Sequence, residues 1–437
     1  MWGMIIFMCI IDIPKHVNRC INMLHKSGYD SYIVGGCVRD SIIGRRPNDW
    51  DICTLATPLQ IKEVFEGYKT IDIGIEHGTI AVIFKEEKIE ITTYRVDGKY
   101  VDNRRPSSVT FTRSLLEDLS RRDFTINAMA YNEASGIIDY FGGKDDILKK
   151  VIRCVGDPIK RFNEDALRIM RALRFASQLN YDIDERTFEG IYATKNLLKN
   201  ISKERIAIEL DKLILSKNPS SIINILFNLN IFEYIINFID ECSLKVNKLS
   251  EVTKKCGLVI ERCPQDLVLR LTVLINYIVQ LYGFIENCEN DKNKKRAFIG
   301  EKILRELKYD NKTIKAVSIL LLYYDIDIRE NKVYIKKILK DIDVELFEKL
   351  LYIKNAEINK KNNNILRILN YILDNNECFK INDLKINGKD IINLGITNGK
   401  LIGQILNALL DMVIENPNMN DADKLKDATL KIVNCLN

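Results

Sequence analysis

The spacing of apolar residues changes along this chain, and the change predicts strands mixed with helices first and helices alone afterwards. In the first hundred residues the apolar runs are short, as in residues 32–34, 71–75 and 79–85, and turn residues separate them. Such runs are typical of β-strands. Beyond Tyr181 the apolar residues recur at helical spacing, as in residues 201–215, without a Gly- or Pro-marked series of strands. We therefore expect a mixed α and β region followed by a helical remainder.

Two helices are predicted near the N-terminus, and the first has an apolar face that can pack on a sheet. Residues 14–27 have apolar residues at helical spacing, with Pro14 at the start and Gly28 just past the end. Residues 58–68 form the second predicted helix. Residues 1–13 are apolar, but they lack a basic segment and a cleavage site and are too short to span a bilayer. We interpret them as a buried element.

A further helix, predicted over residues 155–180, is amphipathic and carries a stripe of arginines. At roughly 100° per residue its apolar and polar residues fall on opposite sides. The apolar side consists of Ala166, Ile169, Met170, Leu173 and Ala176, and the polar side consists of Asp165, Arg168, Arg171 and Arg174. Two such arginines would be typical of a solvated face. Three of them at steps of three, directly behind Glu164 and Asp165, favour a binding role.

The composition is that of an ordinary globular protein with local basic clusters. The chain has 437 residues, 46% hydrophobic and 29% charged, with a net charge of +5, and is long enough for roughly two to four subdomains. Because this charge is mild, nucleic-acid binding would rely on local patches. Residues 292–296 and 336–340 are candidates, although charge runs are usually solvated faces. Eleven cysteines without a CxxC pair indicate neither zinc nor disulfides, and we expect a reducing cytoplasm.

Two aspartates, Asp49 and Asp51, are the first candidates for chemistry. On a strand they would project together, with Trp50 on the opposite face. Two adjacent carboxylates repel each other, so unless they are solvated they need a cation. A hard divalent ion such as Mg²⁺ suits oxygen ligands of this kind. A DxD pattern alone is more often a solvated turn than a metal site.

A double glycine upstream is a candidate phosphate-binding turn. Gly35 and Gly36 follow the apolar run at residues 32–34 and precede a predicted helix over residues 37–43, with Arg39 one turn into it. Glycines let the backbone approach a phosphate closely, and a helix N-terminus supplies free N–H groups. On its own a double glycine is usually a plain turn.

Together these pieces resemble a known family. A double glycine, an arginine three residues on and Asp-x-Asp ten residues beyond it resemble the head motif of the class II nucleotidyltransferases, which comprise the tRNA CCA-adding enzymes and the bacterial poly(A) polymerases. Residues 117–131, EDLSRRDFTINAMAY, which we predict to open a helix, are similar to the family's RRDFTxNA motif. Residues 164–168 are similar to its EDxxR motif, and residues 383–406 resemble its tail segment.

The resemblance implies an α+β fold with four parts. The head would be a nucleotidyltransferase domain of the DNA polymerase β type with a small mixed sheet, followed by an all-α neck, body and tail. We place the head at residues 1–142, the neck that recognises the base at 143–215, the body at 216–340 and the tRNA-binding tail at 341–437. Some relatives append an HD phosphohydrolase domain; because no histidine follows His77, we expect no such activity here.

The resemblance also implies roles for individual residues. Asp49 and Asp51 would be catalytic and would bind two Mg²⁺ ions. Glu90, on a predicted strand over residues 88–95, would add a third catalytic carboxylate, although by itself it is as well interpreted as an exposed side chain. The segment at residues 95–106 resembles the family's flexible loop, which is implicated in switching from C to A addition. The nucleotide-binding residues would be Gly35, Gly36, Arg39, Arg122, Asp123, Asn127, Glu164, Asp165, Arg168, Arg171 and Arg174.

The implied reaction is template-independent addition of C, C and A to the 3′ end of tRNA from CTP and ATP, with release of pyrophosphate. The partners would be the acceptor and T-arm half of tRNA and the two nucleotides, with neither DNA nor a membrane. A bacterial poly(A) polymerase and a specialised CC-adding or A-adding enzyme share the head motifs, and the long helical tail favours the full CCA enzyme. A catalytically inactive RNA-binding module is a further alternative, against which the intact carboxylates and EDxxR motif argue.

Overall fold

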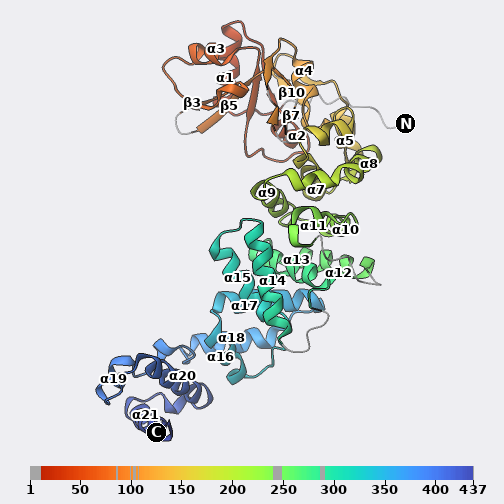
Figure 1. Cartoon of the computed structure of the whole chain (residues 1–437). Helices are drawn as coiled ribbons and strands as arrows, with labels where there is room; N and C mark the ends of the chain where they lie inside the picture. Colours follow the sequence, from red (N-terminus) through yellow and green to blue (C-terminus); the bar gives the residue numbers. More distant parts are fainter. Residues whose placement is uncertain are drawn as a thin grey trace. The chain divides into compact units, whose positions relative to one another are not determined.

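The computed structural model of this chain describes residues 11–84, 87–98, 100–101, 105–106, 108–239, 249–285 and 291–436. The chain forms two compact units. The first covers Met1–Ser243 with Glu306–Lys308, and the second covers Leu244–Arg305 with Tyr309–Asn437. Figure 1 shows a sheet with helices in the first unit and helices in the second.

A seven-stranded mixed sheet lies in the first unit. Its order is β11-β10-β1-β2-β5-β4-β3, and neighbouring strands are antiparallel except for the parallel pair β2 and β5. This confirms the predicted α+β head with a small mixed sheet. The strands are β1 (Ser31–Val34), β2 (Asp51–Thr54), β3 (Lys69–Gly74), β4 (Thr79–Phe84), β5 (Glu87–Thr93), β10 (Met129–Asn132) and β11 (Gly136–Asp139).

Helices of the first unit pack on this sheet or extend beyond it. The predicted helix at residues 14–27 is α1, which buries its apolar side chains Val17, Cys20, Ile21 and Leu24. The first helices are α1 (Lys15–Lys26), α2 (Gly36–Ile42), α3 (Pro58–Val64), α4 (Leu115–Ser120) and α5 (Gly143–Lys149). They are followed by α6 (Pro158–Glu164), α7 (Leu167–Leu179), α8 (Glu185–Thr194), α9 (Lys203–Ile214), α10 (Ser220–Asn228) and α11 (Ile231–Ile235).

Short strands occupy part of the segment that the sequence predicts to be a loop, residues 95–106. β6 (Arg95–Asp97) pairs with β9 (Val109–Phe111), and β7 (Tyr100–Val101) pairs with β8 (Arg105–Pro106). The loop prediction is therefore wrong for these residues, because backbone pairing organises them despite their polar composition. Lys99 and residues 102–104 lie outside the described residues.

The helix that residues 117–131 are predicted to open is α4, which starts before these residues and ends within them. The Ser114 hydroxyl accepts a hydrogen bond from the backbone N–H of Glu117 at 3.3 Å and so begins α4, which ends at Ser120. Arg121 and Arg122 therefore follow a helix instead of opening one. The chain continues through the 3₁₀ turn η2 (Thr125–Asn127) into β10, because pairing with β1 and β11 overrides local helix propensity.

The amphipathic helix predicted over residues 155–180 is divided into α6 and α7 at Asp165. Asp165 is extended, with φ −137° and ψ 103°. Its carboxylate accepts a hydrogen bond from the Leu167 N–H at 3.1 Å, and its carbonyl accepts one from the Arg168 N–H at 3.0 Å. The prediction that Asp165 and Arg168 lie together on one helix is therefore wrong. The arginine stripe is also partly interior, since Arg168 and Arg174 are buried.

The second unit is helical, and among the described residues no helix combines the length and apolar character needed to cross a membrane. A hydrophobic core at its C-terminal end is built from side chains such as Ile405, Leu409 and Val413 of α20. The helices are α12 (Leu249–Arg262), α13 (Leu267–Leu281), α14 (Lys292–Glu306), α15 (Asn311–Leu322), α16 (Lys332–Asp341), α17 (Val344–Ile358), α18 (Asn363–Asp374), α19 (Gly388–Asn393), α20 (Gly399–Glu415) and α21 (Ala422–Leu436).

The two basic clusters that were candidates for RNA contact each contain a fully buried cation. Arg296 is 0% exposed, and its guanidinium bonds to Asp325 and to Asn293. Lys336 is also 0% exposed and forms an ion pair with Glu377 at 3.1 Å. Removing either acid would leave a buried charge unpaired, which is strongly destabilising. These two residues therefore serve the fold, and neither is available to RNA.

Candidate active site

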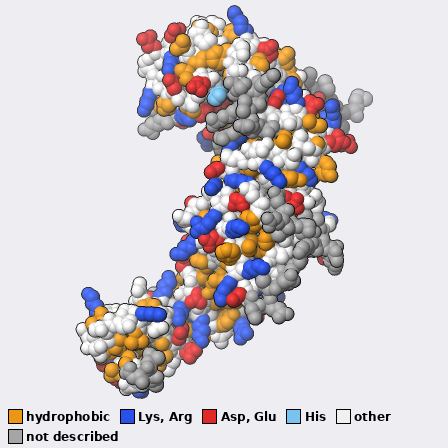
Figure 2. Space-filling view, viewed as in Figure 1, with side chains coloured by type: hydrophobic (Ala, Val, Ile, Leu, Met, Phe, Trp, Pro, Cys, Tyr) orange, Lys and Arg blue, Asp and Glu red, His pale blue; other side chains and the backbone are white. Residues whose placement is uncertain are grey.

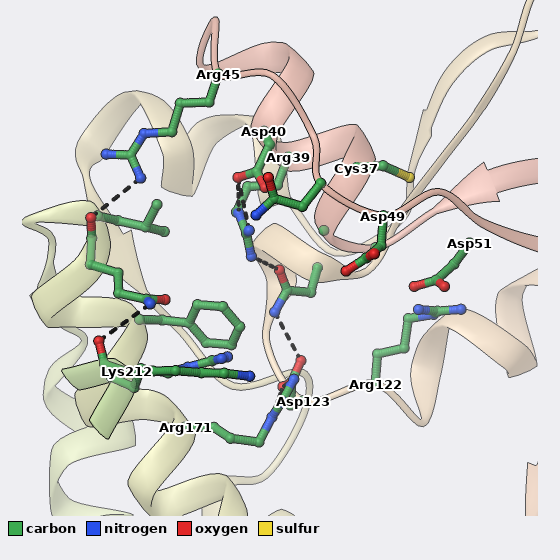
Figure 3. A pocket seen from close by; sticks show the side chains of 18 of the residues that line it. Cys37, Arg39, Asp40, Arg45, Asp49, Asp51, Arg122, Asp123, Arg171 and Lys212 are labelled. Carbon is green, nitrogen blue, oxygen red and sulfur yellow. Dashed lines mark hydrogen bonds and ion pairs between the residues drawn. The ribbon is translucent and has the colours of Figure 1, made fainter. Parts of the chain in front are cut away.

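A pocket of ≈ 890 Å³ in the first unit gathers twelve of the fourteen predicted site residues. Its walls come from α2, the start of β2, the turn after α4, and α7. Figure 3 shows these side chains converging from the head and from α7. Of the predicted residues, Gly35, Gly36, Arg39, Asp49, Asp51, Arg122, Asp123, Asn127, Asp165, Arg168, Arg171 and Arg174 line the pocket, whereas Glu90 and Glu164 do not.

The two predicted metal ligands lie side by side in this pocket (Figure 3). Asp51 is the first residue of β2, and Asp49 lies in the segment before it, so only Asp51 stands on a strand. Trp50 lines a separate hollow, as the predicted alternation requires. Desolvation by the surrounding protein raises the pKa of Asp51. The positive charge of Arg122 opposes this rise, and the negative charges of Glu90 and Asp49 add to it. An added cation would relieve this crowding of negative charge.

Glu90 is beside Asp51 along the sheet but is not part of the pocket lining. The parallel pairing of β2 and β5 places Asp51 opposite Glu90 in register. The Glu90 carboxylate accepts a hydrogen bond from Lys88 Nζ at 2.8 Å. Among the described residues, no group of three or more His, Cys, Asp or Glu side chains is arranged to hold a metal ion. The strand pairing thus places the backbone of Glu90 beside that of Asp51, while the Glu90 side chain is hydrogen-bonded to Lys88.

The glycine turn before α2 is packed tightly against an arginine. Gly35 has φ +83°, a conformation that favours glycine, and a Cβ added there would lie 3.1 Å from Nη1 of Arg122. Arg39, on α2, donates from Nη1 to the Asn127 side-chain oxygen at 2.6 Å and from Nε and Nη2 to Asp40. Arg39 therefore positions Asn127 in the wall of the pocket.

Arg122 is a half-buried cation that faces the carboxylate pair. Its Nη2 lies 3.4 Å from the carboxylate of Asp118, which is itself 0% exposed and also binds Arg121. Burial alone would lower the pKa of Arg122, but the charges of Asp118 and Asp51 raise it above its usual range. Figure 3 shows its guanidinium next to Asp51. A fixed positive charge at this place suits a phosphate group.

Asp123 joins the head to α7 through charged hydrogen bonds. Its carboxylate accepts from Nδ2 of Asn127 at 3.1 Å and from Nε of Arg171 at 2.8 Å. Burial would raise the pKa of Asp123, but Arg171, the hydrogen bonds from Asn127 and Arg171, and the charge of Arg168 lower it to about 2. The ionised form is therefore strongly preferred in the folded protein.

We expect Asp123→Asn to lower the free energy of unfolding near neutral pH by about 2 kcal/mol. Because the pKa of Asp123 is depressed by folding, its contribution is present above its usual pKa and is lost as the pH falls through about 2. Urea unfolding of both proteins between about pH 5 and pH 2 should show their difference shrinking. A difference that stays constant across this range would contradict the ionic role, and Asp72→Asn, at an exposed pair with Lys62, is the control.

The residues of the EDxxR motif are held by partners that the sequence analysis missed. Nη2 of Arg205, on α9, donates to Asp165 at 2.9 Å. Arg168 donates to Glu164 at 2.9 Å and to the carbonyl of Arg121 at 3.0 Å. Glu164 thus stands behind Arg168, outside the pocket lining, and Arg205 fixes the orientation of the Asp165 carboxylate.

A second missed residue, Glu209, is the acidic partner of two arginines of the stripe. It lies 3.0 Å from Nε of Arg174 and 3.9 Å from Nη1 of Arg171, and it is buried. Burial lowers the pKa of Arg174 to about 10, and the charge of Glu209 opposes that shift. Arg205 and Glu209 are four residues apart in the helix predicted over residues 201–215, so the sequence already indicated that their side chains share one face of that helix.

The guanidiniums of Arg39, Arg171 and Arg174 also lie 5.0, 5.3 and 3.9 Å from the centre of the Phe175 ring.

Family models match three parts of the chain. The poly A polymerase head domain matches residues 31–153, the RNA and SrmB-binding site of polymerase A matches residues 180–242, and tRNA nucleotidyltransferase domain 2 matches residues 298–428. The head match contains the glycine turn, the carboxylate pair and the RRDFTxNA segment.

Full-length relatives and solved structures agree with these matches. A CCA-adding enzyme of Ligilactobacillus salivarius is 34% identical over 98% of this chain and 99% of its own length, and one of Pediococcus pentosaceus is 35% identical over 95% and 96%. The crystal structure of the Bacillus stearothermophilus CCA-adding enzyme in complex with CTP has a TM-score of 0.76 at 29% identity and covers 96% of this chain and 97% of that one. On these grounds the chain belongs to the CCA-adding enzyme family.

Proposed function

We propose that the chain adds C, C and A in turn to the 3′ end of tRNA, using CTP and ATP and releasing pyrophosphate. One observation carries this proposal: a single pocket brings the carboxylates Asp49 and Asp51 of the head against the arginines of α7. The carboxylates suit nucleotidyl transfer, and the α7 side suits recognition of a base. Near full-length relatives are named CCA-adding enzymes, and solved relatives contain CTP, ATP or tRNA.

Nucleotidyl transfer of this kind uses a divalent metal, and we propose Mg²⁺ bound by Asp49 and Asp51, with Glu90 as the third carboxylate. The residues fit such an ion because all the donors are carboxylate oxygens, Glu90 pairs in register with Asp51, and the pKa of Asp51 is raised by burial and by its acidic neighbours. When bound, two such ions would activate the 3′-hydroxyl and neutralise the pyrophosphate leaving group.

The triphosphate would lie against the glycine turn and Arg122. Gly35 and Gly36 open the wall of the pocket, and Arg122 supplies a half-buried positive charge there. Arg39 already donates from all three guanidinium nitrogens, so its contribution is to hold Asn127, which together with Asp123 would position the sugar and phosphates.

The base would be read by Asp165 and Arg168, which line the pocket from the α6–α7 junction. Cytosine and adenine each present an exocyclic amine donor beside a ring-nitrogen acceptor, whereas uracil and guanine present a carbonyl beside a ring N–H. An ionised Asp165 only accepts and Arg168 only donates, so the pair matches C and A. U and G would set a carbonyl acceptor against the Asp165 carboxylate and an N–H donor against the Arg168 guanidinium, a mismatch that costs on the order of a few kcal/mol.

A single assay tests the proposed function and separates its alternatives. tRNA transcripts ending before CCA, after the first C or after CC are incubated with one nucleotide at a time, and the 3′ ends are sequenced. We expect C on the first two transcripts, A on the third and no further addition. Continued A addition would identify a poly(A) polymerase. Arrest at CC would identify a CC-adding enzyme, and activity on CC ends alone an A-adding one.

The proposed location is the cytoplasm, where tRNA is the substrate. Cysteine chemistry supports this location: Cys20, Cys37, Cys53, Cys154, Cys256, Cys263 and Cys378 are free and buried in the described part of the chain. Reduced, buried thiols are typical of a reducing compartment.

A further inference from the structure

A basic hollow lies on the outer face of α1, outside the pocket described above. It has a volume of ≈ 530 Å³ and is lined by residues spaced three or four apart along the helix, together with one tyrosine from the end of the α3 region. The lining residues are Ile13, Lys15, Asn18, Arg19, Asn22, Met23, Lys26 and Tyr68. Three of these are cations, and the described lining contains no carboxylate. Figure 1 shows α1 against the sheet of the head.

The charges of this hollow are not neutralised within the described chain. Lys15, Arg19 and Lys26 are exposed and form no ion pair with any described residue. Lys15 and Arg19 are four apart, where like charges repel. Lys15 also begins the helix, whose first turn contains no acid and whose cap, Pro14, makes no side-chain hydrogen bond. A cation there opposes the helix dipole. The like-charged pair and the cation at the helix start are therefore both unfavourable, and no ion pair within the described chain compensates for them. This points to an anion outside the chain.

The wall of the hollow is ordered. The Tyr68 ring packs on Phe84 with centroids 4.5 Å apart and on Phe65 at 6.2 Å, so it is anchored in the head. The Arg19 guanidinium lies 6.0 Å from the centre of this ring. Asn18 donates to Glu133 at 2.8 Å, and Asn22 donates to Asn18 at 3.4 Å. The cations thus stand in a row along a fixed aromatic and amide surface.

We infer that this hollow, together with the outer face of α1, is a second contact surface for the phosphate backbone of RNA. The inference rests on the proposed function, in which RNA is the substrate. A membrane is excluded as the partner because the apolar face of α1 is buried in the head and has nothing to insert. A row of cations beside an aromatic ring and amide donors, without a closed cage for one phosphate, suits a continuous polyanion.

The position of the hollow relative to the carboxylates supports this assignment. A second hollow of ≈ 860 Å³ shares Asp49, Arg45 and Arg46 with the catalytic pocket and extends to Pro14 and His16 at the start of α1. The basic hollow begins at the neighbouring residues Ile13 and Lys15. The start of α1 therefore lies between a hollow that reaches Asp49 and the hollow that contains Lys15, Arg19 and Lys26.

The test is the triple variant Lys15→Glu, Arg19→Glu, Lys26→Glu, measured for binding to a tRNA transcript that ends before CCA. We expect affinity to fall at least about tenfold at low salt and the slope of log affinity against log salt to decrease by about 2, since each lost phosphate contact removes about 0.7–0.9. Single-turnover addition of C at saturating RNA should stay at the wild-type rate. Lys15→Glu places an acid in the first turn of α1, which favours the helix and offsets the unfavourable acid that Lys26→Glu places in the last turn, so a loss of affinity would not reflect unfolding of α1.

The matched control is Lys144→Glu, Lys149→Glu, Lys160→Glu, which changes the net charge equally at exposed lysines of the same unit. An equal loss of affinity in both triple variants would reduce the effect to overall charge and overturn the inference. Unchanged affinity and slope in the α1 variant would overturn it as well. Both outcomes differ from failure of the proposed function, in which the wild-type protein itself would add neither C nor A.

Discussion

Asp49→Ala and Asp51→Ala are each expected to abolish nucleotide incorporation, reducing turnover on the order of 10³-fold. Both carboxylates face the same pocket, and Asp51 adjoins Glu90 across the parallel strand pair. Without either one, the proposed ions lose a ligand where negative charge develops. Single-turnover addition of CTP to a tRNA transcript measures the effect. Filter binding of the same transcript should stay unchanged, because RNA affinity comes from phosphate contacts elsewhere.

The control for this experiment is Asp72→Ala, which removes an exposed carboxylate of the edge strand β3 that pairs with Lys62 at 2.8 Å. It should keep wild-type turnover. Electron paramagnetic resonance of added Mn²⁺ gives a readout independent of activity, and either catalytic variant should lose the bound signal. Retention of more than a tenth of wild-type turnover by Asp49→Ala or Asp51→Ala would remove that residue from the mechanism.

Asp165→Asn is expected to reduce discrimination between CTP and UTP on the order of 10²-fold. A neutral amide can donate as well as accept, so it no longer repels the carbonyl of uracil or guanine. Values of kcat/KM for each of the four nucleotides, measured singly on transcripts ending before CCA and after CC, test the expectation. Slower addition with an unchanged preference for C and A would show that Asp165 does not read the base.

The charge-reversed pair, Asp165→Arg with Arg168→Asp, is a poorer test because of the partners that hold both residues. It would place a new arginine beside Arg205 and a new carboxylate beside Glu164. Structural pairs would then be lost together with base recognition. The matched control for Asp165→Asn is Arg205→Gln, which loosens the carboxylate without changing the group that meets the base. It should lower kcat/KM for CTP and ATP while their preference over UTP and GTP largely remains.

Features that depend on neighbours in sequence were predicted well. The Gly35–Gly36 turn, α1 with its buried apolar face and the strands β4 and β5 follow from short-range pattern and turn chemistry. Asp49 and Asp51 are only two residues apart, so any extended backbone brings them to one side. The family resemblance then linked these local pieces to one fold and reaction, as the family matches confirm.

Features decided by distant partners were predicted less well. The helical pattern runs through Asp165 without interruption, yet its carboxylate accepts hydrogen bonds from the Leu167 N–H and from Arg205, forty residues on, and the helix breaks there. Likewise, residues after Ser120 leave the helix because β10 is held between β1 and β11. The interior positions of Arg296 and Lys336 depend on Asp325 and Glu377, whose proximity no spacing reveals. In each case a tertiary contact overrides local preference.

The parallel pairing of β2 with β5 sets the order in which the catalytic pocket can form during synthesis. A parallel pair needs a crossover, so Asp51 and Glu90 meet only after α3, β3 and β4 have been made. β1 remains an open edge until β10 emerges to pair with it. Arg205 and Glu209, which fix Asp165 and Arg174, follow still later. In the proposed mechanism the carboxylates are therefore synthesised before the residues that fix the base-reading side chains, and we expect a chain that ends before α9 to lack nucleotide selectivity.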